Sequence, residues 1–260
     1  MRTWLILPAS ALLATSVHAA GPEPGRLSMS VIGGVDVPLS GDVHDGAVAP
    51  VPDLGPLNPA LAGVSAELRI GARSHDRIYD LADTYGLEFA YAFDENRELF
   101  GQVRQTRAGR GSLQVGGAYV PALDAELPVY GSFSAYEALS AELGYRWYFG
   151  TAGTARPFVA ARVGATRTDA ISATFEIPDG GITIANAPFF DSGWSPTAGL
   201  DVGVIIPAGE TFSVTLTGGL RYTGDLKDDD SAIGGLGLGS INDTGSRFSV
   251  PVTLAARWDF

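Results

Sequence analysis

The chain has 260 residues, a formal net charge of −12 at pH 7 and no cysteine. An acidic chain lacks the basic surface through which proteins bind nucleic acid, so a nucleic-acid partner is excluded. Without cysteine the protein has no disulfide framework, and a sizeable hydrogen-bonded scaffold must stabilise it instead.

Residues 1–20 have the features of a secretory signal peptide. Arg2 provides a positive charge before an apolar stretch, and Val-His-Ala at positions 17–19 fits a small-residue cleavage site. The apolar stretch is interrupted by Pro8 and is short for a membrane-spanning helix. We therefore expect residues 1–20 to be a signal peptide removed on export, and residues 21–260 to form a single domain.

The remaining chain predicts strands rather than membrane helices. No apolar run of roughly eighteen residues follows the signal peptide, so a membrane-spanning protein would have to be a closed barrel. Eight segments alternate apolar and polar residues with a period of two, and each is near the span of a tilted membrane strand, about 9–11 residues. These segments are residues 27–38, 84–94, 97–106, 137–149, 156–167, 195–206, 212–223 and 247–260.

Residues 64–73 form a ninth strand-like segment. Bacterial outer-membrane barrels have an even number of strands, and eight strands also place both chain ends on the periplasmic side. We therefore assign residues 64–73 to an extension in the first loop. A membrane strand at this position is the open alternative.

The connections between the eight segments alternate in length. Short turns lie at 94–97, 150–154 and 207–210, and long connections lie near 39–83, 107–136, 168–194 and 224–246. Short periplasmic turns and long extracellular loops are typical of outer-membrane barrels. The predicted fold is all-β: a closed antiparallel transmembrane β-barrel of about eight strands, with four long extracellular loops.

The last segment ends on a bare aromatic residue, Phe260. It resembles the C-terminal strand of bacterial outer-membrane barrels, where a final Phe is part of the signal read by the assembly machinery. As a whole, residues 21–260 resemble the small outer-membrane barrel superfamily of OmpA-, OmpX- and OmpW-type proteins, on architecture rather than on a motif. The resemblance implies localisation in the bacterial outer membrane, with lipid and lipopolysaccharide as partners, and no OmpA-type periplasmic domain after Phe260.

The alternation also predicts which side chains face the lumen and which face lipid. An Arg on the lipid face near the bilayer midplane costs roughly 2–4 kcal/mol, so charged positions should point inward. We predict a buried network of paired charges, because an eight-stranded barrel has room only for its own side chains; a narrow path for small solutes stays open. The interior set is Glu88, Glu142, Arg146, Arg162, Asp201, Arg221 and Arg257, and the membrane-facing aromatics are Phe93, Tyr145, Trp147, Phe149, Phe212, Tyr222, Trp258 and Phe260.

Two of the long loops share a loose pattern of β-like segments around Val120-Pro121 and Ile177-Pro178, with a fainter echo at 51–52. One interpretation is that these β-like segments project from the barrel and form an apolar binding surface above it. The other, which we favour, is that the outer strands extend past the membrane and pack together.

Few residues suggest catalytic or metal chemistry. His44 and His75 both lie in the first loop, and their neighbours in sequence point to opposite faces of a strand, so we interpret both as solvated and expect no enzymatic activity. The Gly-rich stretch at 234–239 lacks the Lys-Ser/Thr of a phosphate loop and is interpreted as a flexible loop tip. We interpret an acidic run without EF-hand spacing as solvated and expect neither a metal nor a cofactor; its members are Asp225, Asp228, Asp229 and Asp230.

The sequence therefore predicts an integral outer-membrane barrel with a structural or surface-interaction role through its long loops. A narrow channel for small or apolar solutes, like the OmpW-type proteins, is the first alternative. A lipid A-modifying enzyme, which exists on this architecture, is the second. The sequence does not identify an extracellular partner.

Overall fold

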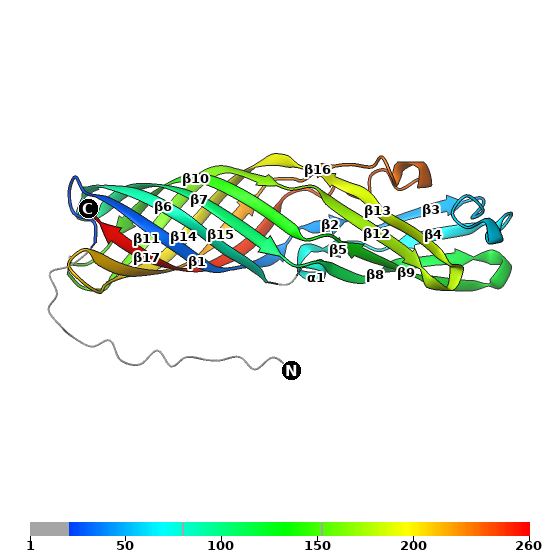
Figure 1. Cartoon of the computed structure of the whole chain (residues 1–260), viewed down its shortest axis with the longest axis horizontal. Helices are drawn as coiled ribbons and strands as arrows, with labels where there is room; N and C mark the ends of the chain where they lie inside the picture. The colour runs from blue at the N-terminus through cyan, green and yellow to red at the C-terminus, as the bar shows by residue number, and fades with distance from the viewer. Residues whose placement is uncertain (1–20, 80, 152) are drawn as a thin grey trace, which may run out of the picture.

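The computed structural model describes residues 21–79, 81–151 and 153–260, so the predicted signal peptide at 1–20 lies outside the described residues. The molecule is elongated, with a barrel at one end and a second sheet extending from the other end (Figure 1). In the described ranges, no helix is long and apolar enough to cross a membrane.

The barrel is closed and has eight antiparallel strands, which confirms the predicted fold class. Its order is β1-β17-β15-β14-β11-β10-β7-β6, and β6 pairs with β1 to close the ring. All eight predicted strand segments lie in it. The strands are β1 (Leu27–Ser40), β6 (Ala82–Asp94), β7 (Arg97–Ala108), β10 (Tyr136–Tyr148), β11 (Arg156–Thr168), β14 (Gly193–Pro207), β15 (Phe212–Thr223) and β17 (Arg247–Asp259).

The four long connections fold together at one end of the barrel, and we call them the loop module (residues 41–79, 109–135, 169–192 and 224–246). Each contributes to a seven-stranded sheet of order β16-β13-β12-β9-β8-β4-β3, while β2 and β5 pair separately. Its strands are β2 (Asp42–His44), β3 (Ala47–Val51), β4 (Ala66–Ile70), β5 (Arg73–Ser74), β8 (Gly111–Val120), β9 (Ala125–Phe133), β12 (Ile171–Ile177), β13 (Ile182–Asp191) and β16 (Lys227–Asp228). Its short helices are η1 (Pro59–Leu61), α1 (His75–Ile78), η2 (Pro121–Leu123), η3 (Pro178–Gly180) and η4 (Gly234–Leu236).

The strand-like segment at 64–73 contributes β4 to the loop module and no strand to the barrel, as expected for a loop extension. The repeated hydrophobic-Pro pattern marks the tips of hairpins. Pro121 starts η2 between β8 and β9, and Pro178 starts η3 between β12 and β13. Proline has no backbone N–H to donate, so it suits the first position of such a turn.

The two hairpins pair with each other through β9 and β12, where Phe133 is opposite Ala173. The hairpins therefore pack together, as the favoured interpretation expects, but they do so in a sheet separate from the barrel strands and not as extensions of those strands. Their inner faces build an apolar core, which is separate from the smaller aromatic cluster inside the barrel.

The fourth connection covers this core. Ile233, Leu238 and Ile241 are buried in it, and the Ile241 carbonyl accepts a hydrogen bond from the Asp45 N–H at 2.6 Å. Of the stretch at 234–239, interpreted from the sequence as a flexible loop tip, Gly234, Gly235 and Gly237 are exposed while Leu238 is buried in this core. Apolar residues alternate with glycine in this stretch, and burial of the apolar side chains stabilises the packed conformation. The glycine spacing alone does not show that these side chains are buried.

Candidate functional site

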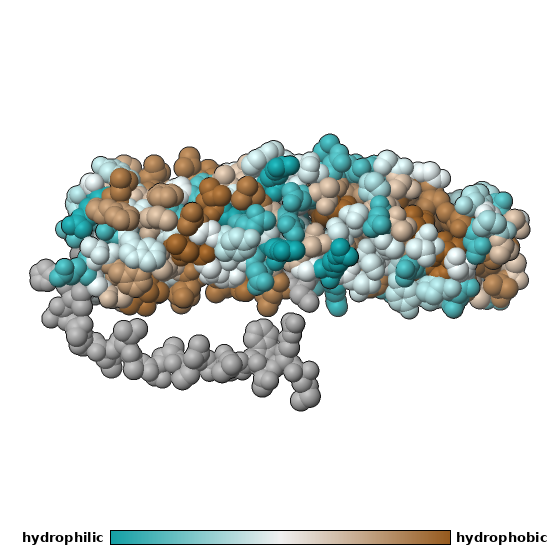
Figure 2. Space-filling view, viewed as in Figure 1, coloured by the Kyte–Doolittle hydropathy of each residue, from teal (hydrophilic) through white to brown (hydrophobic). Residues whose placement is uncertain are grey.

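The outer wall of the barrel is apolar. Leu143 and Trp147 on β10 are 64% and 52% exposed, and Figure 2 shows apolar surface over much of the barrel, with a hydrophilic zone where the barrel meets the loop module. Such a wall matches the hydrocarbon of a bilayer. The structure places on this wall all eight aromatics predicted to face the membrane, namely Phe93, Tyr145, Trp147, Phe149, Phe212, Tyr222, Trp258 and Phe260.

The half of the lumen nearest the short turns holds a cluster of ion pairs around Glu98, which is fully buried. Arg257 Nη1 donates to Glu98 Oε2 at 2.8 Å, and the Tyr148 hydroxyl donates to Glu98 Oε1 at 2.8 Å. Arg146 also donates to Glu98, and it donates to Glu88 Oε2 at 2.9 Å. One carboxylate therefore joins strands β7, β10 and β17.

A second cluster lies nearer the loop module, around Glu142. Arg221 Nη2 donates to both oxygens of Glu142, at 2.8 and 2.6 Å. Arg162 lies 3.7 Å from Glu142 through Nε and 3.0 Å from Asp201 through Nη2. Each partner is buried, so these charges compensate one another inside the barrel.

The structure thus brings together all seven residues of the predicted interior set. It adds Asp36, Glu98, Arg104 and Asp259, which the set omitted although strand alternation already placed them on the inner face. The guanidinium of Arg146 also lies over the rings of Phe100 and Phe158, at 4.5 and 4.9 Å. Ion pairs and aromatic rings therefore pack the lumen.

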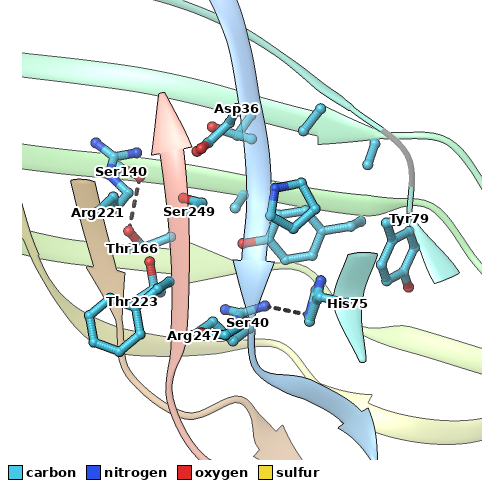
Figure 3. Close-up of a pocket in the computed structure, with 17 residues that line it drawn as sticks. Asp36, Ser40, His75, Tyr79, Ser140, Thr166, Arg221, Thr223, Arg247 and Ser249 are labelled. Carbon is cyan, nitrogen blue, oxygen red and sulfur yellow. Dashed lines mark hydrogen bonds between the residues drawn. The ribbon is translucent and has the colours of Figure 1, made fainter. Parts of the chain in front are cut away.

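A cavity of about 590 Å³, open solvent included, lies between the Glu142 cluster and the loop module; polar and apolar side chains both line it, and we call it the mouth cavity (Figure 3). The hydroxyls of Ser140 and Thr166 are 2.9 Å apart in its wall. Figure 3 shows hydroxyl side chains and two arginines around this space, with His75 and Tyr79 at its edge. The labelled lining residues are Asp36, Ser40, His75, Tyr79, Ser140, Thr166, Arg221, Thr223, Arg247 and Ser249.

His75 and Arg247 close one side of the mouth cavity. Arg247 Nη1 donates to His75 Nε2 at 3.0 Å, and its guanidinium lies 5.2 Å from the ring of Tyr136. Burial, with the charge of Arg247, holds the pKa of His75 well below its ordinary value, so its imidazole is neutral and accepts this bond. The interpretation of His75 as solvated was wrong, because α1 folds back over the barrel rim and buries it.

A second cavity lies inside the loop module, and we call it the module cavity. It measures about 650 Å³, open solvent included. His44, interpreted from the sequence as solvated, is 1% exposed and lies in its wall between Phe133 and Phe189, so that interpretation was also wrong. The wall comprises His44, Leu54, Leu57, Leu68, Ile70, Val129, Phe175, Ile177, Ile182, Ile184, Phe189, Ile233, Leu236, Leu238 and Ile241.

In the acidic run of the fourth connection, Asp229 accepts a hydrogen bond from the Ser231 N–H at 3.0 Å, and hydrogen bonds from the Ser231 side chain and backbone lower the pKa of that carboxyl. Beside the run, Lys227 Nζ donates to Asp191 at 2.6 Å. In the described part of the chain, no group of three or more His, Cys, Asp or Glu is arranged to hold a metal ion.

No family model matches the chain, and no characterised protein sequence matches it. Among solved structures it is similar to Neisserial surface protein A, with 12% identity over 90% of this chain and 97% of that chain, at a TM-score of 0.41. It is also similar to the outer membrane protein OprG from Pseudomonas aeruginosa, with 17% identity over 92% and 98% at a TM-score of 0.37. A third similar structure is the outer membrane protease OmpT from Escherichia coli, with 9% identity over 92% and 98% at a TM-score of 0.41.

Proposed function

We propose that the protein is a non-enzymatic bacterial outer-membrane barrel that anchors a folded extracellular module, and that this module mediates surface interactions. One observation carries the proposal: all four long connections fold into a single sheet with its own apolar core, standing on a barrel whose lumen is packed. Connecting eight strands does not require such a module, and loops held on a rigid scaffold commonly carry function.

Outer-membrane lipid and lipopolysaccharide are the proposed partners of the apolar wall. The exposed C-terminal Phe260 is the proposed contact for the assembly machinery. The acidic surface of the chain argues against nucleic acid as a partner of the module.

Two features support a protein that neither conducts nor catalyses. Buried Arg–carboxylate pairs cross the lumen at two levels, leaving little room for a solute path. Neither His44 nor His75 hydrogen-bonds a Ser hydroxyl or a carboxylate within the described residues, so neither has the partner that activates a nucleophile. The OmpW-like channel is the alternative that conductance would support.

The first test is fractionation of expressing cells, followed by gel electrophoresis with and without boiling. We expect recovery in the outer membrane and a band whose mobility changes on boiling, as for a closed barrel. Purified protein in planar bilayers should show no steady ion conductance. Steady conductance would overturn the closed-lumen proposal in favour of a channel.

The second test determines which end faces the medium. Because the chain has no cysteine, Leu123→Cys at the module tip and Thr151→Cys in a short turn each introduce a single thiol. Leu123 is 65% exposed, and Thr151 is exposed as well. In intact cells a membrane-impermeant maleimide should label Leu123→Cys and not Thr151→Cys. The reverse pattern would contradict an extracellular module.

A further inference from the structure

The tips of three connections meet at the end of the loop module that lies away from the barrel (Figure 1). They are the turn that contains η1, the hairpin tip that contains η2 and the hairpin tip that contains η3. Asn58, next to η1, donates from Nδ2 to the carbonyl oxygen of Gly180 in η3 at 2.9 Å. A cavity of about 600 Å³, open solvent included, lies between the three tips, and we call it the tip cavity.

The tip cavity is apolar and opens to the surface. Ten of its twelve lining residues are Leu, Ile, Val or Ala. Val120, Ile177 and Ile182 are buried and form its floor, whereas Ala122 is exposed and Leu123 is 65% exposed at its edge. Apolar side chains that are exposed together in this way are typical of surfaces that bind a partner.

The same three tips carry negative charge. Residues 51–65, 118–127 and 176–183 contain no Lys, Arg or His. Their five carboxylates are all exposed: Asp53, Asp124, Glu126, Glu176 and Asp179.

Little of this charge is compensated within the protein. In the described part of the chain, the ion pair that reaches these carboxylates joins Arg69 to Glu126 at 3.3 Å, and Arg69 also pairs with Glu67 at 2.7 Å. Asp179 lines the tip cavity itself. Hydrogen bonds from the N–H groups of two glycines lower the pKa of Asp53, so this carboxylate is ionised at neutral pH.

We propose that the tip cavity docks a cationic segment of another protein, which inserts one aromatic or aliphatic side chain into the cavity and pairs flanking Lys or Arg residues with the carboxylates of the tips. The apolar floor suits a buried anchor of the kind that dominates binding energy in protein interfaces. The excess of negative charge attracts a cationic partner and repels an acidic one. This inference rests on the proposed surface-interaction role of the loop module and specifies the chemistry of its partner.

The test compares three short peptides that carry the same dye, by fluorescence anisotropy with the full-length protein in phosphatidylcholine nanodiscs. Their sequences are Lys-Lys-Trp-Lys-Lys, Lys-Lys-Ser-Lys-Lys and Glu-Glu-Trp-Glu-Glu, and empty nanodiscs give the background. The Lys-Trp peptide should bind about tenfold more tightly than either of the others, because only it has both the anchor and the positive charge. Added salt should weaken its binding, because salt screens exposed charges.

Variants at exposed positions locate the site. Ala122→Trp fills the tip cavity from its edge and should weaken binding of the Lys-Trp peptide about tenfold. Val48→Trp, at a 67% exposed position outside the cavity, should leave binding unchanged. Asp179→Asn should weaken binding about two- to fivefold, as for an exposed ion pair. Asp228→Asn, an exposed position on β16 opposite the end of β13 that adjoins β14, is its matched control and should have little effect.

Equal binding of the Lys-Trp and Lys-Ser peptides would overturn the inference, because charge alone would then account for binding. Equal binding of the Lys-Trp and Glu-Trp peptides would overturn it as well, since the carboxylates would have no part in it. Unchanged binding by Ala122→Trp would show that the peptide binds elsewhere. If the peptides fail although Leu123→Cys is labelled from outside the cell, the partner chemistry is wrong and the proposed function stands. The reverse labelling pattern would instead remove the proposed function, whatever the peptides do.

Discussion

Arg221 on β15 and Glu142 on β10 meet across the lumen, with two hydrogen bonds of 2.8 and 2.6 Å between the guanidinium and the carboxylate. Two strands, β14 and β11, separate β15 from β10 in the barrel wall, so the pair spans the interior instead of joining neighbours. A charge pair in this position replaces solvent in the lumen and links opposite walls, which makes the barrel interior a polar core.

Removing one partner of this pair should be strongly destabilising. Glu142→Gln keeps the shape of the side chain but leaves Arg221 without its buried counter-charge, for an expected loss of about 3–5 kcal/mol. Glu137→Gln is the matched control, because Glu137 lies on the same strand and pairs with Arg107 at 3.1 Å on the exposed surface. It should cost about 0–1 kcal/mol. Urea unfolding in lipid vesicles measures both; similar losses would contradict a buried network.

Placing a charge on the outer wall should be costly only where lipid surrounds it. Leu143, in the middle of β10, and Leu123, at the tip of the loop module, are 64% and 65% exposed. Leu143→Arg should lose about 2–4 kcal/mol in vesicles. Leu123→Arg should be close to neutral, because water surrounds that position. Equal effects in the same unfolding assay would mean that the apolar wall of the barrel does not face hydrocarbon.

Acidification should weaken the attachment of α1 to the barrel mouth. The pKa of His75 lies well below 6.5 in the folded state because of burial and the charge of Arg247. As pH falls below 6.5, His75 becomes protonated in the unfolded chain but stays neutral in the folded chain. The free energy of unfolding therefore decreases until the pH reaches the pKa of His75 in the folded state. Between pH 7.5 and 5.5, unfolding of His75→Gln should depend less on pH than unfolding of the unmodified protein. Identical slopes would show that His75 is not buried.

The strand pairing of the loop module can be tested by disulfide formation. Ser132 is opposite Thr174 on one side and opposite Ser112 on the other. Paired antiparallel residues have Cα atoms about 4.5–5.5 Å apart, within disulfide range. Ser132→Cys with Thr174→Cys should therefore cross-link on oxidation. Ser112→Cys with Thr174→Cys should not, since two strand spacings amount to roughly 9–10 Å. Reversed results, read from gel mobility, would refute the order of β8, β9 and β12.

The sequence by itself determined the eight barrel strands and the two faces of each. A period of two assigns every residue of a strand to one face, and a one-residue slip would place charges such as Glu142 and Arg146 on the lipid side. This pattern is local, so it can be recognised without knowing which strands meet. It also assigns Glu98 and Arg104 to the inner face, although the predicted network did not include them.

The tertiary structure decided which charges pair, how the four loops combine and where the two histidines lie. Arg221 reaches Glu142 across the lumen and Arg247 reaches His75 from the opposite end of the chain, so strand closure brings together residues that are distant in sequence. The loop module depends in the same way on pairing between separate hairpins and on the fourth connection covering their core. His44 occupies a short strand with no recognisable burial pattern, and only the packing of Phe133 and Phe189 around it makes it an interior residue.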